Sequence, residues 1–227
     1  MSGSKVIIVR KKKQDMFLKL KQRFNRPVFG MKQEVLEEFM HADELEASEH
    51  ITEGILDKRQ LTFFYPGCGL DVVQPLLYAL KICSAERINF VFADKDLKAD
   101  ELASLMLQLT DNHNYTTKKV DRYTEVAEFF FQDRYISFIC KSGDVLTRIP
   151  KELKAGYDVY FERAFEIFRE ENPSFLPDIL DHLNKDGIVI SDAGLPKEIA
   201  KDLEKIKVSP KAKPLGFYKR LSMYRKK

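Results

Sequence analysis

Two glycines close behind an apolar run form the first candidate ligand site in this sequence. The segment "FFYPGCGLDVVQPL" (63–76) passes from strand-forming residues into a loop with Gly67 and Gly69, and an apolar segment follows. Because glycine has no Cβ, such a loop can bend sharply and bring its backbone close to a ligand. Tight turns between strands and helices also contain glycines for packing alone, so two glycines are consistent with either role.

Two aspartates follow later apolar runs at places where they could contact the same ligand. Asp94 ends the run "INFVFAD", 25 positions after Gly69, and Asp144 lies in "KSGD" after "YISFIC". A carboxylate at the first place can accept hydrogen bonds from ribose hydroxyls, and one at the second can accept from the exocyclic amino group of a base. In the alternative interpretation, Asp94 or nearby Asp96 caps the following helix, and "KSGD" is a plain polar turn.

An acidic residue at the start of the next helix argues against a dinucleotide. NAD places its pyrophosphate at a helix N-terminus, where Asp71 would repel it. Val72 also stands where the pattern G-x-G-x-x-G requires its last glycine. Asp71 can itself be the N-cap of this helix, with Gln74 three residues later, close to a capping box.

The segment "FERAF" after the fourth expected strand holds the candidate catalytic residues. Glu162 could orient or deprotonate a nucleophile, and Arg163 could hold an anionic group of a substrate. The simpler interpretation, which we favour from the sequence, is a surface ion pair on the first turn of a helix. Asp192 is a weaker candidate. The histidines and cysteines show no spacing typical of metal ligands, and we expect the three cysteines to be reduced and structural.

The elements that must position these residues alternate between short apolar runs and helical periods from residue 61 onward. We expect five strands at "LTFFY", "INFVFAD", "YISFICKSGD", "YDVYFE" and "GIVISDAG", with helices between them that include residues 121–131 and 196–206. This alternation favours a parallel sheet with helices on both faces. The last two runs, "IKVS" and "GFYKRLSMY", have no helix between them and can pair only antiparallel.

The predicted fold is therefore α/β, a doubly wound, mostly parallel sheet of seven strands with an antiparallel C-terminal strand pair. Residues 14–57 are helical in pattern, so we expect an N-terminal helical segment over residues 1–57 and a main domain over residues 58–227.

Composition and net charge limit the class of protein and the kinds of partner that the sequence allows. The chain has 227 residues, of which 44% are hydrophobic and 32% charged, as in a soluble globular protein. No apolar run approaches the roughly 20 residues of a membrane span, and the N-terminal apolar run is too short for a signal peptide, so we expect a cytoplasmic protein. The net charge of +3 implies no polyanionic partner by itself. The basic stretches at residues 11–13 and 218–227 are solvated ends or, alternatively, a rim facing RNA or phosphate.

The order and spacing of these segments resemble the Rossmann-like S-adenosylmethionine-dependent methyltransferases over about residues 60–227. The resemblance is carried by "FFYPGCGLD", "FVFAD", "FICKSGDVL", "YDVYFE", "LNKDGIVISD" and the terminal strand pair. It implies S-adenosylmethionine as cofactor, with Gly67 and Gly69 against its methionine part. It also implies that Asp94 binds the ribose and Asp144 the adenine amino group, and that Leu97 borders the adenine.

Two departures from the family pattern leave two functional hypotheses. Tyr65 stands where the family usually has an acidic residue, and Asp71 stands where it usually has a third glycine. If Asp71 supplies the missing negative charge near the cationic cofactor, both residues belong to the cofactor site and the chain is a methyltransferase. Its acceptor, a small molecule, an RNA or a protein, is not identified by the sequence. If the loop has decayed, the chain is a non-catalytic binding or scaffold protein.

Overall fold

The structure, a computed structural model, describes residues 30–110, 114–146, 156–166, 170–216 and 220–227. The first predicted helix, within residues 14–24, and the basic stretch at residues 11–13 lie outside the described residues. No helix in the described ranges is long and apolar enough to cross a membrane.

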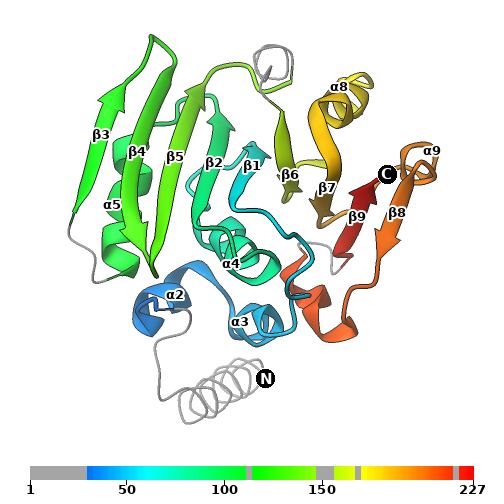
Figure 1. Cartoon of the computed structure of the whole chain (residues 1–227), viewed down its shortest axis with the longest axis horizontal. Helices are drawn as coiled ribbons and strands as arrows, with labels where there is room; N and C mark the ends of the chain where they lie inside the picture. The colour runs from blue at the N-terminus through cyan, green and yellow to red at the C-terminus, as the bar shows by residue number, and fades with distance from the viewer. Residues whose placement is uncertain (1–29, 111–113, 147–155, 167–169, 217–219) are drawn as a thin grey trace, which may run out of the picture.

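One sheet of nine strands organises the chain, in the order β3-β4-β5-β2-β1-β6-β7-β9-β8 (Figure 1). Its five central strands run parallel to one another. They are β5 (Arg134–Ser142), β2 (Arg87–Asp94), β1 (Gln60–Pro66), β6 (Tyr157–Glu162) and β7 (Leu183–Ser191). We call the side of the sheet at which these five strands end the carboxyl edge.

Both flanks of the sheet are antiparallel. On one side β4 (Thr124–Phe131) pairs antiparallel with β5, and β3 (Tyr115–Lys119) pairs antiparallel with β4. On the other side β9 (Ser222–Lys226) pairs antiparallel with β7, and β8 (Leu203–Ile206) pairs antiparallel with β9. The predicted doubly wound, mostly parallel sheet of seven strands is therefore wrong: the sheet is mixed, has nine strands and carries an additional antiparallel hairpin.

The additional hairpin explains much of this error. Residues 121–131 were expected to be a helix because apolar residues recur there every three or four positions, yet Thr124–Phe131 is strand β4. Its burial follows the two faces of a sheet: Phe129 and Phe131 are buried, whereas Phe130 between them is 65% exposed. Gln132 and Asp133, both with positive φ, form the two-residue turn that lets Phe131 pair with Arg134.

A second error lies near the C-terminus. The helix expected over residues 196–206 is only α9 (Lys197–Ala200), and β8 begins three residues later. The helix lasts little more than one turn and buries no side chain, so no apolar face holds a longer helix against the sheet.

Helices cover both faces of the sheet, and each face has its own apolar core. On one face lie α4 (Val73–Ile82) and α5 (Ala99–Leu109), together with α2 (Gln33–Phe39) and α3 (Ala42–Ser48) (Figure 1). On the other face lies α8 (Phe175–His182), and the end of α9 packs against the apolar core of that face. A short 3-10 helix, η1 (Pro210–Leu215), contacts α3.

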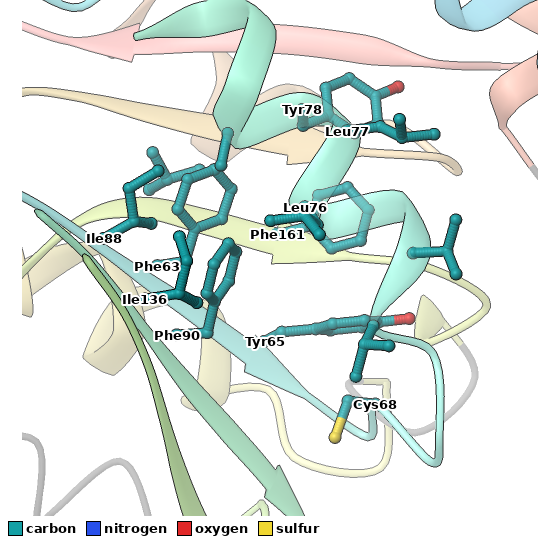
Figure 2. Packing of buried hydrophobic residues seen from close by; sticks show 14 of the residues in the cluster. Phe63, Tyr65, Cys68, Leu76, Leu77, Tyr78, Ile88, Phe90, Ile136 and Phe161 are labelled. Carbon is teal, nitrogen blue, oxygen red and sulfur yellow. The ribbon is translucent and has the colours of Figure 1, made fainter. Parts of the chain in front are cut away.

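Strand β1 shows how the sequence builds these two cores. Phe63 and Tyr65 point to the face of α4, and Phe64 between them points to the face of α8. Figure 2 shows Phe63 packed beside Phe90 of β2. The ring of Phe161 of β6 lies against Tyr65 of β1 and Tyr78 of α4. The continuous apolar run "LTFFY" is thus typical of a strand buried on both faces, as expected from the sequence.

Candidate functional site

The glycine loop crosses the carboxyl edge between β1 and α4. The N–H of Gly67 donates to the carbonyl oxygen of Ala93 at 2.7 Å, and the N–H of Gly69 donates to Oδ2 of Asp94 at 2.7 Å. Both glycines have positive φ, +61° at Gly67 and +52° at Gly69, a conformation that other residues adopt only with strain. The two hydrogen bonds hold the loop against the end of β2.

Gly67 is also required by its surroundings. A Cβ at this position would lie 2.5 Å from the ring of Phe165, which is closer than two carbon atoms can approach. Around Gly69, by contrast, no atom of the described residues lies within 4 Å of such a Cβ. Gly69 is therefore required only for the left-handed backbone of the loop. Gly67 is required for that backbone and also leaves room for an aromatic ring from the segment after β6.

Asp94 lies at the junction of two cavities on this edge. Its Oδ1 accepts from the N–H of Lys95 at 2.6 Å, so both carboxylate oxygens are held by backbone donors, and each keeps a further acceptor position. The larger cavity has a volume of about 650 Å³, and the smaller has about 270 Å³. The larger is lined by Gly67, Asp94, Lys95, Gly143, Asp144, Val145, Leu146 and Phe165, and the smaller by Gly69, Leu70, Asp94, Lys95, Asp96, Leu97 and Glu101.

Asp144 reaches the same cavity from the end of β5. The N–H of Gly143 donates to the backbone oxygen of Asp94 at 3.0 Å, which joins the two strand ends. Oδ1 of Asp144 accepts from the N–H of Leu146 at 2.9 Å, and the side chain is exposed. The structure thus brings Gly67, Asp94 and Asp144 around one cavity of a size typical of ligand sites.

Tyr65 and Asp71 lie elsewhere, in a polar cluster at the start of α4. The hydroxyl of Tyr65 donates to Oδ2 of Asp71 at 3.2 Å, and Oδ1 of Asp71 accepts from the N–H of Gln74 at 3.3 Å. Neither residue lines either cavity. Asp71 therefore satisfies a backbone donor in the first turn of α4, as a capping residue does. The predicted N-cap is nevertheless one residue off, because Val72 is the N-cap of α4, and the Gln74 side chain donates to Glu44 and forms no capping box with Asp71.

Arg163 joins this cluster and links it to the N-terminal helices. Its Nη2 lies 2.8 Å from Oε1 of Glu44 on α3, and its Nη1 lies 3.6 Å from Oδ2 of Asp71. Burial raises the pKa of Asp71, and the nearby Arg163 guanidinium opposes that rise. Burial likewise holds the pKa of the Tyr65 hydroxyl well above its ordinary value, with the Asp71 carboxylate adding to the effect.

Glu162 is buried beside β7. It is 1% exposed, and its carboxylate accepts from the hydroxyl of Tyr160 at 2.8 Å and from that of Ser191. The expected surface ion pair of Glu162 with Arg163 is therefore wrong, because Glu162 lies in the interior and Arg163 pairs with Glu44 and Asp71. Asp192 is also buried, and its Oδ2 accepts from the N–H of Ala164 at 2.8 Å.

Two residues of this region were missed in the sequence. Phe165 shapes the larger cavity and packs on the glycine loop, although it stands in the segment "FERAF" that we had singled out for its charges. Glu44 gives Arg163 its closest carboxylate from 119 residues away along the chain. An acid in the helical pattern of α3 carries no signal of such a partner, so only the structure could show this pairing.

Cysteines and metal-binding clusters are the other features of the chain that could support chemistry. Cys68, Cys83 and Cys140 are all free and buried. Burial raises the pKa of the Cys68 thiol well above its ordinary value and that of Cys140 to about 12, so neither is a thiolate at neutral pH. Among the described residues, no group of three or more His, Cys, Asp and Glu is arranged to hold a metal ion.

Comparison with models of known protein families gives no match, and neither does comparison with curated proteins. A functional assignment must therefore start from the geometry of the carboxyl edge.

Proposed function

We propose that this chain binds S-adenosylmethionine in the larger cavity at the carboxyl edge and transfers its methyl group to an acceptor. The observation that carries the proposal is the position of Asp94, a carboxylate fixed by the N–H groups of Gly69 and Lys95 at the junction of the two cavities. Its remaining acceptor positions suit the two hydroxyls of a ribose. Asp144 lines the same cavity and offers an acceptor for the amino group of a base.

The charges of the site favour a cationic nucleoside over a dinucleotide. Asp94 and Asp144 line the larger cavity, and Lys95 is the one basic residue among the described residues that line it. At the start of α4, where a pyrophosphate would need free N–H groups, Asp71 already accepts from the N–H of Gln74. The ammonium and sulfonium groups of S-adenosylmethionine are stabilised by such carboxylates.

The apolar part of the wall supports the same ligand class. Val145 and Leu146 follow Asp144, and Phe165 lines the same cavity from the segment after β6. These side chains offer apolar surface to a flat base beside the acceptor on Asp144. For the methionine part to lie against Gly67, the ring of Phe165 must turn away from that glycine.

In such a reaction, the residues of the chain would contribute mainly by positioning the acceptor against the methyl group. When bound, S-adenosylmethionine supplies an electrophilic methyl group whose transfer needs little acid–base assistance. Holding the nucleophile in line with that group gives most of the rate. Glu162 and Arg163 are engaged with Tyr160, Ser191, Glu44 and Asp71, so in this conformation they support the strand ends around the cavity. A small molecule, an RNA and a protein all remain candidate acceptors.

A non-catalytic binding or scaffold protein is the second candidate, and one observation favours it. Phe165 packs directly on Gly67, where the cofactor's methionine part is proposed to lie. If the ring stays there, the larger cavity serves another ligand or none.

Calorimetric titration of the purified chain separates the two candidates. We expect micromolar binding of S-adenosylmethionine and S-adenosylhomocysteine and much weaker binding of NAD, which carries the disfavoured pyrophosphate. Failure of both S-adenosyl compounds to bind at millimolar concentration would contradict the proposal and favour the non-catalytic protein.

A further inference from the structure

A second cavity with a different charge lies at the β8 side of the sheet. It has a volume of about 570 Å³ and lies between the end of β8, η1 and the start of β9. We call it the basic groove, because four of the described residues that line it are cations and none of them is acidic. The lining residues are Lys205, Ile206, Lys207, Val208, Lys213, Arg220, Leu221 and Ser222.

The cations of the basic groove carry uncompensated charge. All four are exposed, and none of them forms an ion pair with another residue in the part of the chain that the structure describes. The last 27 residues of the chain contain ten lysines and arginines but only two acidic residues, although the whole chain has a net charge of only +3. The rest of the chain is therefore net acidic, and positive potential concentrates at this one side.

Protection of a sheet edge explains only part of this arrangement. Lysines on an edge strand such as β8 keep other chains from pairing with it, which accounts for Lys205. Lys213 comes from η1 and Arg220 precedes β9, so neither lies on the edge strand. Their convergence on the same groove calls for an anionic ligand.

The basic groove also opens on the same edge of the sheet as the candidate cofactor cavity. Ser191, the last residue of β7, pairs with Ser222, the first residue of β9. Ile206, the last residue of β8, pairs with Met223 next to it. The groove residues around these positions therefore lie at the carboxyl edge, across β7 and β9 from the central strands (Figure 1).

We propose that the basic groove binds the phosphate backbone of a single-stranded nucleic acid. Lys205 and Lys207 lie two positions apart on nearly extended chain, so their Cα atoms are separated by about 6.5 Å, and Lys213 and Arg220 add cations from other elements. This spread suits successive phosphates better than one isolated anion. Ile206 and Val208, both partly exposed, supply apolar surface for sugars.

A single strand suits the shape of the groove better than a duplex. Among the described elements that line it, η1 is the one helix, and it has only six residues. A helix or ribbon that enters the major groove of a duplex must protrude, whereas a concave basic groove can follow one backbone. This inference does not depend on the cofactor proposal, because it concerns a separate cavity.

Fluorescence anisotropy with the full-length chain tests the proposal. The probes are a labelled single-stranded RNA of about 15 nucleotides, single-stranded DNA of the same sequence and the corresponding duplex, at salt concentrations from 50 to 200 mM. We expect both single strands to bind more tightly than the duplex. If four phosphates are neutralised, log K should fall with log salt with a slope of up to about −3.

Charge reversal assigns that binding to the groove. The double variant Lys205→Glu with Lys207→Glu should weaken binding of the single-stranded RNA at least tenfold and reduce the salt slope by about 1.4. Lys213→Ala with Arg220→Ala serves as a second variant that leaves β8 unchanged and should weaken binding in the same direction. Lys185→Glu, an exposed lysine on β7 that does not line the groove, should change the affinity less than twofold.

Four results would overturn the proposal, three of them from the binding measurements and one from competition. The first three are no binding of either single strand at 50 mM salt, tighter binding of the duplex, and equal loss of affinity in the Lys185→Glu control. Competition by polyglutamate as effective as competition by unlabelled RNA at equal charge would also overturn it, because the groove would then bind anions without regard to a nucleotide backbone.

Discussion

The backbone N–H of Gly69 donates to Oδ2 of Asp94 across 2.7 Å, so the glycine loop is tied to the end of the neighbouring strand. The same carboxylate lines both cavities at the carboxyl edge. Asp94 therefore has two roles in this account. It holds the glycine loop in place, and it offers the hydrogen-bond acceptors that a ribose requires. Any ligand that bonds to this carboxylate is coupled to the conformation of the loop.

Replacement of Asp94 tests both roles. We expect Asp94→Ala to weaken binding of S-adenosylhomocysteine more than tenfold and to destabilise the fold by about 0.5–1.5 kcal/mol, because two solvent-exposed backbone donors exchange the carboxylate for water. Calorimetry and urea unfolding measure the two effects. Asp181→Ala, at an exposed carboxylate on α8 away from both cavities, is the matched control and should change neither. Unchanged affinity in Asp94→Ala would remove Asp94 from the binding site.

The two glycines of the loop should respond differently to alanine. Gly69→Ala adds only the strain of a left-handed backbone, about 1–2 kcal/mol. Gly67→Ala adds a clash with the ring of Phe165 and should cost at least about 1 kcal/mol more. In the double variant Gly67→Ala with Phe165→Ala, the total loss in the free energy of unfolding should be smaller than the sum of the two single losses. Additive losses would mean that Phe165 does not limit the space at Gly67.

The partly buried carboxyl group of Asp71, whose side chain is 20% exposed, predicts a particular pH dependence. Since burial raises its native pKa above the unfolded value of about 3.9, the protonated form favours folding. This contribution is complete below the unfolded pKa and is lost as the pH rises through the native pKa. Asp71→Asn should therefore be at least as stable as wild type at pH 7, and its advantage should shrink as the pH falls toward 3.

Urea unfolding at several pH values measures this dependence, with Asp181→Asn as the exposed control. A variant Asp71→Asn that is destabilised at pH 7 and approaches wild type at low pH would show the opposite sign. The attraction of Arg163 for the Asp71 carboxylate would then exceed the cost of burying that carboxylate.

Two buried tyrosines test how much a hydrogen bond to a buried hydroxyl contributes to stability. The hydroxyl of Tyr78 has no hydrogen-bond partner among the described residues, whereas the hydroxyl of Tyr157 donates to the carbonyl oxygen of Ile179. Tyr78→Phe should be neutral or stabilise the fold by up to about 1 kcal/mol, and Tyr157→Phe should destabilise it by about 1 kcal/mol. A clear loss of stability in Tyr78→Phe by thermal unfolding would show that its hydroxyl has a partner in solution.

The sequence was sufficient where local patterns decide the structure. The apolar runs that became β1 and β2, and the glycines between β1 and α4, were identified because buried strands and tight turns use few residue types. It was insufficient at β4, where Tyr123, Val126, Ala127 and Phe130 have helical spacing although the segment is a strand. The turn at Gln132 and Asp133 contains no glycine, so the usual hairpin signal was missing there.

Tertiary contacts decided the rest of the candidate site. Asp94 and Asp144 lie around one cavity, as their places after neighbouring strands indicated, and their roles in binding stay predictions. Asp71 could not be assigned without Arg163, nor Arg163 without Glu44, because ion pairs between distant segments leave no periodic trace in a sequence. The antiparallel flanks of the sheet were underestimated for the same reason, since their partners are set by the whole fold.

The most direct test of the central claim is a map of where S-adenosylhomocysteine binds. Backbone amide NMR spectra of the ¹⁵N-labelled chain, recorded during a titration to saturation, would provide it. We expect the largest shift changes at Gly67, Gly69, Lys95 and Gly143, with small changes at Lys205 and Lys207 in the basic groove. No shift changes at millimolar ligand, or changes concentrated away from the Asp94 cavities, would contradict the account.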